Sequence, residues 1–284
     1  MSLKSELKEF LDLQFGYTAP LSYAIDFAPL FSVHNDAHWV VEREPSSEKI
    51  ISTGAYYLRT LTNGMPVALI GAIATDEHFR HQGLASKVVN KLLEHAKQDG
   101  AQWAFLWTDK PDFFETLGFQ PKGLLLVVEA LALKDETTVF EFEASTATAW
   151  LKQYTLAQRH TDFTICKLSP RELADLSLIE SVRYYVGKAS GQTVLFAHGR
   201  GLDMQNILHS WSAPTHEALT QAYADFKNLI DSQAKILLHP AHIEYFTNYN
   251  INYFETPMVY AKALVDSAKD IDFETLYISG LESL

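Results

Sequence analysis

The sequence has few cysteines and few basic side chains, and each shortage excludes a class of protein. Cys166 is the only cysteine among 284 residues, which excludes an intramolecular disulfide framework and a cysteine-based zinc site and favours a reducing cytoplasm. Lysine and arginine total 23 against 35 aspartates and glutamates, a formal net charge of −12. Because nucleic acids and anionic membranes attract clustered basic side chains, neither is the expected partner.

Long apolar runs are also missing. Residues 1–15 alternate charged and apolar side chains at helical spacing and lack the continuous apolar stretch of a secretory signal. No later segment approaches the roughly 20 apolar residues that span a bilayer. The sequence therefore predicts an intracellular, cytoplasmic protein.

What the chain does contain is an ordinary globular composition. Hydrophobic residues make up 47% of it and charged residues 20%, with no disordered or collagen-like bias. At about 150 residues per domain, this length predicts two compact units, each large enough to bury its own core.

Changes in hydrophobic period predict the elements of the first half. The stretch 66–75 is almost wholly apolar, which is typical of a central strand covered on both faces. Asn63-Gly64 before it supplies the residues that a tight hairpin turn needs. The predicted elements in chain order are a helix at 3–14, strands at 38–44, 50–61 and 66–75, a helix from Leu84 to Gly100, a strand at 101–108, a short helix from Pro111 to Gly118 and a strand at 124–131.

The second half repeats this order. After a predicted strand at 234–239, residues 244–251 match residues 112–119 at a constant offset of 132, with Asn250 where Gly118 stands. The earlier elements of this half are strands at 182–187, 193–199 and 206–211 and a helix at 218–230. Charged and small polar residues at 134–145 predict a boundary, with one domain at 1–134 and a second at 135–284.

One stretch carries a recognisable chemical pattern. The central strand ends in Ile73, Ala74 and Thr75, and a loop with Arg80 and Gly83 then opens the next helix. Such a turn aims unpaired backbone N–H groups and the positive end of the helix dipole at one point, which suits a pyrophosphate. The pattern is neither a Walker A loop nor G-x-G-x-x-G. Taken alone, it also fits an ordinary glycine-containing helix start.

Two motifs together resemble the GNAT superfamily of acyl-CoA-dependent N-acyltransferases. The first is Arg80-x-x-Gly83-x-Ala85, which resembles the family's (Arg/Gln)-x-x-Gly-x-(Gly/Ala) between a central strand and a helix. The second is residues 113–119, FFETLGF, which resembles the family phrase F-Y-E-K-L-G-F and begins 30 residues after Gly83. The resemblance covers residues 38–131 well and is only topological after residue 134.

This resemblance implies an α+β fold with two GNAT-like domains, each a mixed, mostly antiparallel sheet with flanking helices and splayed central strands. It implies acetyl-CoA, or another short acyl-CoA, as cosubstrate and a small-molecule amine as acceptor. The residues that it implies for the cofactor are the strand end and loop, Ile73, Ala74, Thr75, Arg80, His81, Gln82, Gly83, Leu84, Ala85 and Ser86, together with Phe114, which would pack against the cofactor arm.

The catalytic groups are less clear. In the family, a tyrosine of the second motif commonly protonates the departing thiolate, and this chain has Phe114 there, which cannot donate a proton. No carboxylate lies within the apolar central strand to act as a base. Asp109 and Glu42 are the candidates, and each is also explained as a solvated surface acid. Tyr56 and Tyr57 are better explained by strand packing.

The second domain is expected to be degenerate. Superposing the helices places Glu217 or, at the constant offset, Thr215 where the first domain has Gly83, and neither is glycine. Thr215 would cap the helix. His209 is predicted to be a satisfied buried histidine, and His239 and His242 lack a third ligand, so no metal site is expected.

Two further alternatives stay open. The missing acid and base also fit a noncatalytic acyl-CoA sensor or assembly protein. The degenerate domain either shapes the amine pocket or forms a subunit interface, and the sequence leaves the oligomeric state open.

Overall fold

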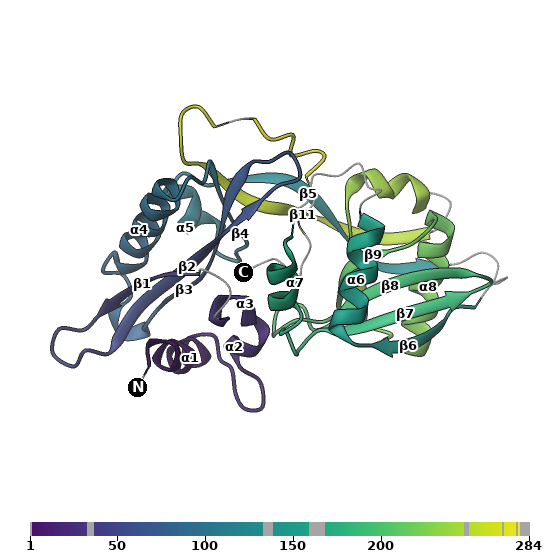
Figure 1. Ribbon diagram of the computed structural model, residues 1–284, viewed down its shortest axis with the longest axis horizontal. Coiled ribbons are helices and arrows are strands. Elements are labelled where there is room, and N and C mark those ends of the chain that lie inside the picture. The colour runs from purple at the N-terminus through teal and green to yellow at the C-terminus, as the bar shows by residue number, and fades with distance from the viewer. Residues whose placement is uncertain are drawn as a thin grey trace.

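The computed structural model describes residues 2–32, 37–132, 139–158, 168–246, 250–268, 270–276 and 278. Cys166 and the predicted boundary residue 134 lie outside these ranges, so the division into domains at 134 stays a prediction. Figure 1 shows two halves, each with its own sheet region and helices, joined through a pair of long central strands. None of the helices within the described ranges is long and apolar enough to span a membrane.

The first half follows the predicted order of elements. β3 has the predicted bounds, and Asn63 and Gly64 (φ +85°) form the turn before it, where the Asn63 side chain accepts a hydrogen bond from the Met65 N–H at 3.0 Å. The elements are α1 (Leu3–Gln14), α2 (Tyr23–Asp26), α3 (Ala28–Phe31), β1 (His38–Arg43), β2 (Ile50–Thr60), β3 (Pro66–Thr75), the 3₁₀ helix η1 (Glu77–Phe79), α4 (Leu84–Gln98), β4 (Trp103–Leu106), α5 (Pro111–Thr116) and β5 (Gln120–Ala132).

The second half repeats the order. β4 and β10 lie at the predicted offset of 132 residues. The elements are β6 (Glu141–Ser145), α6 (Ala147–Gln158), α7 (Pro170–Leu176), β7 (Arg183–Ala189), β8 (Gln192–His198), β9 (Ile207–Ser212), α8 (His216–Leu229), β10 (Lys235–Leu238), the 3₁₀ helix η2 (Pro240–Phe246) and β11 (Asn250–Ala263).

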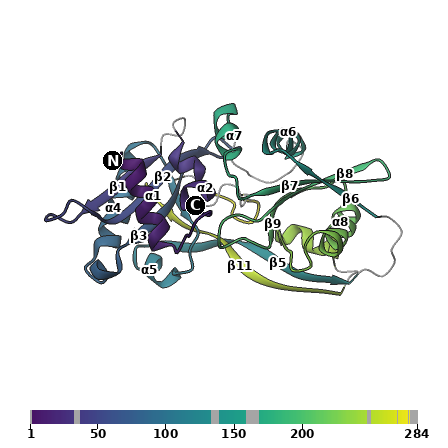
Figure 2. The same cartoon turned by 90° about the horizontal axis from the view of Figure 1, so that it is seen from below.

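The strands within the described residues form one sheet, whose order is symmetric about the β11–β5 pair except that the second half has one additional edge strand, β6. The order is β1-β2-β3-β4-β11-β5-β10-β9-β8-β7-β6. The last strand of each half has moved into the other half: β11 pairs with β4, and β5 pairs with β10, while β5 and β11 run antiparallel to each other along most of their length. Figure 2 shows these two strands crossing from one half to the other. We call this arrangement the strand exchange.

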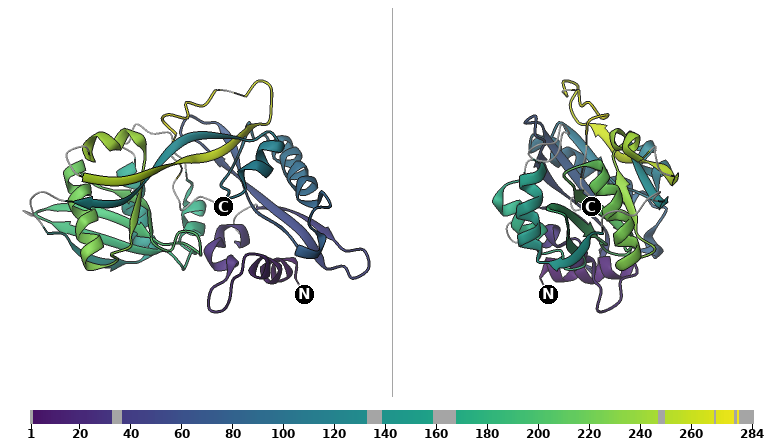
Figure 3. Two further views of the ribbon diagram at one scale, coloured as in Figure 1. Left: turned by 180° about the vertical axis from the view of Figure 1, so that it is seen from behind. Right: turned by 90° about the vertical axis from the view of Figure 1, so that its right-hand side faces the viewer.

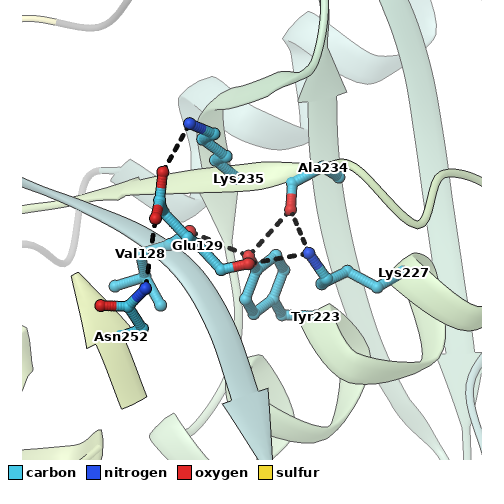
Figure 4. Close-up of polar contacts among 7 residues, drawn as sticks. All are labelled: Val128, Glu129, Tyr223, Lys227, Ala234, Lys235 and Asn252. Carbon is cyan, nitrogen blue, oxygen red and sulfur yellow. Dashed lines mark hydrogen bonds and ion pairs between the residues drawn. The ribbon is translucent and has the colours of Figure 1, made fainter.

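A polar cluster holds β5 in the second half. The Lys227 ammonium donates to the main-chain oxygens of Glu129 and Ala234 at 2.8 Å each, and Lys235 pairs with the Glu129 carboxylate at 2.6 Å. The Tyr223 hydroxyl lies 2.9 Å from the oxygens of both Val128 and Ala234. As Figure 4 shows, these contacts connect β5 to α8 and to the start of β10.

Helices cover both faces of each half (Figure 3). In the first half, α4 packs on the face that carries Tyr56, and the N-terminal helices pack on the opposite face, which carries Tyr57. The core beneath the N-terminal helices also contains Ile271, Leu276 and Ile278, which follow β11 in the sequence. The buried tyrosines thus serve packing, as predicted.

Several elements differ from the sequence prediction. The segment 134–145, predicted to hold a domain boundary, contains β6, an edge strand whose mostly exposed side chains leave no apolar pattern. The helices α2, α3, α6 and α7 and the strand β11 were not predicted. Strand β5 also begins at Gln120, earlier than the predicted 124, because pairing with β11 extends it.

Candidate active site

The central feature of the first half is the point where β3 and β4 part. The two parallel strands pair only from Val67–Trp103 to Leu69–Phe105. Within the described residues, no strand pairs with the same edge of β3 beyond Leu69. The predicted splay is therefore present, and the main chain of Ile73, Ala74 and Thr75 lies on the parted segment.

A bulge marks the parted segment. The register between β2 and β3 shifts opposite Gly54, and Ala72 has a φ of +54°, a conformation that most residues avoid. A bulge in a strand beside a site turns main-chain groups out of the regular ladder. Here the bulge precedes Ile73, so the last three residues of β3 pair with β2 in a register shifted from that of the rest of the strand.

The loop after β3 folds back on the strand end. Asp76 caps η1 by accepting from the His78 N–H at 2.9 Å, and the Arg80 Nε donates to the Thr75 oxygen at 3.2 Å. His81 has a positive φ of +61°. Residues 80–83, which include Gln82, are exposed, so the loop between the strand and the helix faces solvent.

Gly83 forms the N-cap of α4 in a left-handed conformation, with φ +77° and ψ 4°. A Cβ at this position would meet no atom within 4 Å, so the space beside its main chain is open. Glycine alone adopts this conformation without strain, and it lets a ligand approach the backbone closely.

The first turn of α4 is available to an anion. Leu84, Ala85 and Ser86 form this turn, which carries no acidic residue. Within the described residues, no protein acceptor meets their N–H groups. Unpaired N–H groups and the helix dipole make such an end attractive to phosphate.

Phe114 lies in the core below α4. It is 7% exposed and contacts Phe113 and Phe119 edge-on, with ring centroids 4.9 and 5.8 Å away. Its predicted contact with a cofactor arm stays a prediction. No hydroxyl exists at this position to protonate a leaving group.

The two carboxylates proposed as bases have other partners. Glu42 accepts from Lys87 and Lys91 at 2.7 Å each; burial acts to raise its pKa, but the two ammonium groups outweigh burial and lower it. Asp109 is exposed and pairs with Lys110 at 2.9 Å. These contacts favour a surface role for both.

Sequence analysis did not single out the groups on the other side of the parted strands. The hydroxyl of Tyr23, from α2, meets the backbone of Ala72. The Tyr23 ring stacks between Phe15 and Phe27 at 4.9 and 4.3 Å. Burial raises its pKa, although Arg200 from the second half acts to lower it. The aromatic residues at 21–31 were the one available signal.

The corresponding end of the second half is closed. β9 and β10 pair over two residues, and beyond them the Trp211 indole donates to the Leu237 oxygen at 2.8 Å. Thr215 caps α8 by accepting from the Ala218 N–H at 3.1 Å, as predicted. Thr215 is therefore the N-cap residue that occupies the position of Gly83.

His209, His216 and His242 in this half each lie within hydrogen-bond distance of a neighbouring group. The buried His209 contacts the Ser210 hydroxyl at 3.0 Å and the Gly199 oxygen at 3.2 Å, and burial lowers its pKa to about 3. His216 Nε2 lies 3.3 Å from His242 Nδ1. In the described part of the chain, no group of three or more histidine, cysteine, aspartate or glutamate residues could hold a metal ion.

Most of the first half matches the model of one protein family. Residues 4–119 match the model of the acetyltransferase (GNAT) family. No curated protein sequence matches the chain.

Solved structures resemble both halves. The chain is 12% identical to a GCN5-related N-acetyltransferase from Kribbella flavida, with a TM-score of 0.61 over 92% of this chain and 69% of that one. It is 13% identical to a GCN5-related N-acetyltransferase from Anabaena variabilis and to a protein from Enterococcus faecalis described as a probable N-acyltransferase, each with a TM-score of 0.62 over 92% of this chain and 70% of the other. At these identities the likeness shows the fold alone, and it extends over both halves.

Proposed function

From the match of residues 4–119 to the model of the acetyltransferase (GNAT) family, we propose that this chain is an N-acyltransferase. It moves an acetyl or another short acyl group from acyl-CoA to a primary amine, either of a small molecule or of another amino group. The observation that carries this proposal is the open N-terminus of α4 beside the parted edge of β3.

The residues present fit the phosphates of acyl-CoA. The open space at Gly83 admits an anion to the main chain, and the N–H groups of residues 84–86 are the donors that would bind it. Arg80, whose Nε already holds the end of β3, would add a charge-assisted contact through its remaining N–H groups.

The edge of β3 would hold the acyl end. Acyl-CoA supplies an acyl group activated as a thioester, and those main-chain N–H groups of residues 73–75 that do not pair with β2 are the donors that would face the parted edge. A fixed N–H donor stabilises a carbonyl oxygen more as charge develops on it than in the ground state. This would promote attack by a neutral amine.

A single cofactor site follows in this proposal. The second half, closed at Trp211 and Thr215, would shape the acceptor side instead of binding a second acyl-CoA. The proposed division is a catalytic domain at 1–134 and a degenerate domain at 135–284, tied together by the strand exchange.

Thermal unfolding with acetyl-CoA tests the cofactor part of the proposal. A ligand at 100 times its Kd stabilises the folded state by about 2.7 kcal/mol, so the melting temperature should rise by several degrees with millimolar acetyl-CoA. An unchanged melting temperature at that concentration would remove the proposal's main support. Release of free thiol with a panel of amines then tests transfer.

A noncatalytic acyl-CoA sensor is the second candidate, favoured by the phenylalanine at position 114. Such a protein would be stabilised by acetyl-CoA but would release thiol no faster with amines than without them. Thiol release above background with any amine excludes it.

A further inference from the structure

The exchanged strand β11 ends beside α5, the short helix that carries Phe114. Its last residues pair with β4, the strand that parts from β3. Side chains alternate between the two faces along a strand, and Ala261 belongs to the core beneath the N-terminal helices, whereas Tyr260 packs on the opposite face against the cluster that contains Phe114. Lys262, two residues after Tyr260, lies on the face that α5 covers.

Lys262 contacts the end of α5 directly. Its ammonium donates to the main-chain oxygen of Leu117 at 2.6 Å. Its side chain also runs past Gly118, where an added Cβ would lie 3.5 Å from both Cε and Nζ. The last carbonyls of a helix lack partners within the helix, and a lysine ammonium both satisfies one of them and favours the negative end of the helix dipole. A residue of the exchanged strand therefore caps this helix.

α5 is a short helix that depends on contacts from outside. It spans only Pro111–Thr116, and a helix of this length is not stable on its own. The N–H groups of Leu117 and Phe119 close the turn that follows by donating to the Phe114 oxygen at 3.0 and 3.1 Å. The Leu117 oxygen instead accepts from Lys262, so this hydrogen bond ties the turn to β11.

α5 also borders the opening between the parted strands. β4 pairs with β3 only as far as Phe105, and the chain then leaves the sheet and enters α5. Phe114 shares one core cluster with Val88 and Val89 of α4, and Figure 1 shows α5 next to α4. The position of α5 therefore sets the position of the chain that faces the free edge of β3.

We propose that Lys262 is a positioning residue for the acyl-CoA site: by capping α5 from the exchanged strand, it fixes the wall against which the acyl-bearing arm of the cofactor binds. This rests on the proposed function. The last strand of the second half thus completes the cofactor site of the first half. The phosphates bind elsewhere, at the N-terminus of α4, so their affinity does not depend on Lys262.

Lys262→Met tests this, because it keeps an apolar chain of similar length beside Gly118 and removes the donor. Calorimetry should show that acetyl-CoA binds about tenfold more weakly. Adenosine 3′,5′-bisphosphate, the nucleotide part of CoA without the arm, should bind as it does to the unsubstituted protein. Lys262→Arg keeps a donor on a long side chain and should recover most of the affinity for acetyl-CoA. In turnover with an amine, KM for acetyl-CoA should rise more than kcat falls.

Lys227→Met is the matched control. Lys227 on α8 donates to the main-chain oxygens of Glu129 and Ala234, so it also ties an exchanged strand to a helix, but in the second half. Urea unfolding should show a loss of stability at least as large as in Lys262→Met, while the affinity for acetyl-CoA stays unchanged. Equal weakening of acetyl-CoA binding in both variants would show that affinity follows stability and would overturn the proposal.

Hydrogen exchange without any ligand tests the cap separately. The amides of Leu117 and Phe119 should exchange several-fold faster in Lys262→Met but not in Lys262→Arg, because the turn that they close loses its tie to β11. Unchanged exchange, or unchanged affinity for acetyl-CoA in Lys262→Met, would overturn the positioning role and leave acyl transfer standing. Absence of stabilisation of the unsubstituted protein by acetyl-CoA would instead overturn the proposed function.

Discussion

The two halves share an order of elements, yet their equivalent helix ends differ in every chemical respect. The N-terminus of α4 begins at a left-handed glycine with open space beside it, and its first turn has no acid. The N-terminus of α8 begins at Thr215, whose hydroxyl already accepts an N–H, and Glu217 follows in its first turn. We therefore expect the first end to bind an anion more readily than the second.

The strands beside these helix ends differ in the same way. β3 and β4 part and leave an edge, whereas the Trp211 indole bridges to β10 where β9 and β10 part. A capping hydroxyl and one aromatic side chain thus distinguish the closed end from the open end on a similar scaffold. Function therefore depends on what lines the ends of the strands and not on the scaffold alone.

The largest effect is expected in a fragment that ends at residue 132, which tests whether the first half folds without the second. The first half would lose β11 from between β4 and β5 and would lose Ile271, Leu276 and Ile278 from its core. We expect no cooperative unfolding transition by circular dichroism and no stabilisation by acetyl-CoA. A monomeric fragment that unfolds cooperatively would show that the first half is independent of the exchange.

Opening the closed end should affect stability but not the cofactor. Trp211→Ala removes the hydrogen bond to the Leu237 oxygen and the edge contact with His242, and should destabilise the protein by about 2–3 kcal/mol, below the range for fully buried tryptophans because this one is partly exposed. Urea unfolding measures the loss. Calorimetry should still find one acetyl-CoA per chain, and a second site would contradict our account of the closed half.

A glycine pair sharpens the comparison at the open end. Gly83→Ala and Gly100→Ala place a methyl group at the two ends of α4, both at positive φ and both with open space. Each should cost about 1–2 kcal/mol of stability through backbone strain. Only Gly83→Ala should also weaken acetyl-CoA binding, by about tenfold or 1.4 kcal/mol. Equal affinities in the two variants would show that phosphate does not approach Gly83.

Lowering the pH should slightly reduce the stability of the second half. Burial, and then His216 and His239, lower the pKa of His242 to about 4, and burial also lowers the pKa of His216. Between pH 6.5 and about 4 the unfolded chain therefore binds more protons than the folded one, so stability falls as pH falls through this window. Urea unfolding at pH 7, 6 and 5 measures it, and His242→Asn should flatten the slope. A slope unchanged in that variant would assign the effect to other groups.

Sequence alone predicts what depends on neighbouring residues. The bounds of β3, the turn at Asn63-Gly64 and the cap at Thr215 each follow from a short stretch and match the structure. The open glycine at the start of α4 is equally local, because its role depends on its own backbone conformation. The positions of most strands and of the two main helices were therefore accessible from patterns along the chain.

What depends on distant pairing was not predictable. No local sequence pattern specifies that β5 pairs with β10 and β11, since an apolar strand suits any buried position in a sheet. The hydrogen bond from Arg200 to the main-chain oxygen of Asp26 joins residues 174 positions apart. Neither residue belongs to a motif, and only the fold brings them together.

The strand exchange also sets the order in which the protein can be completed during synthesis. The ribosome finishes residues 120–132 before any of residues 250–263 exists, and at about 5–20 residues per second the interval is roughly 6–25 s. During that time β4 and β5 lack the strand that lies between them in the finished sheet, and exposed strand edges invite pairing with other chains. The half that is translated first is thus the one that is assembled last.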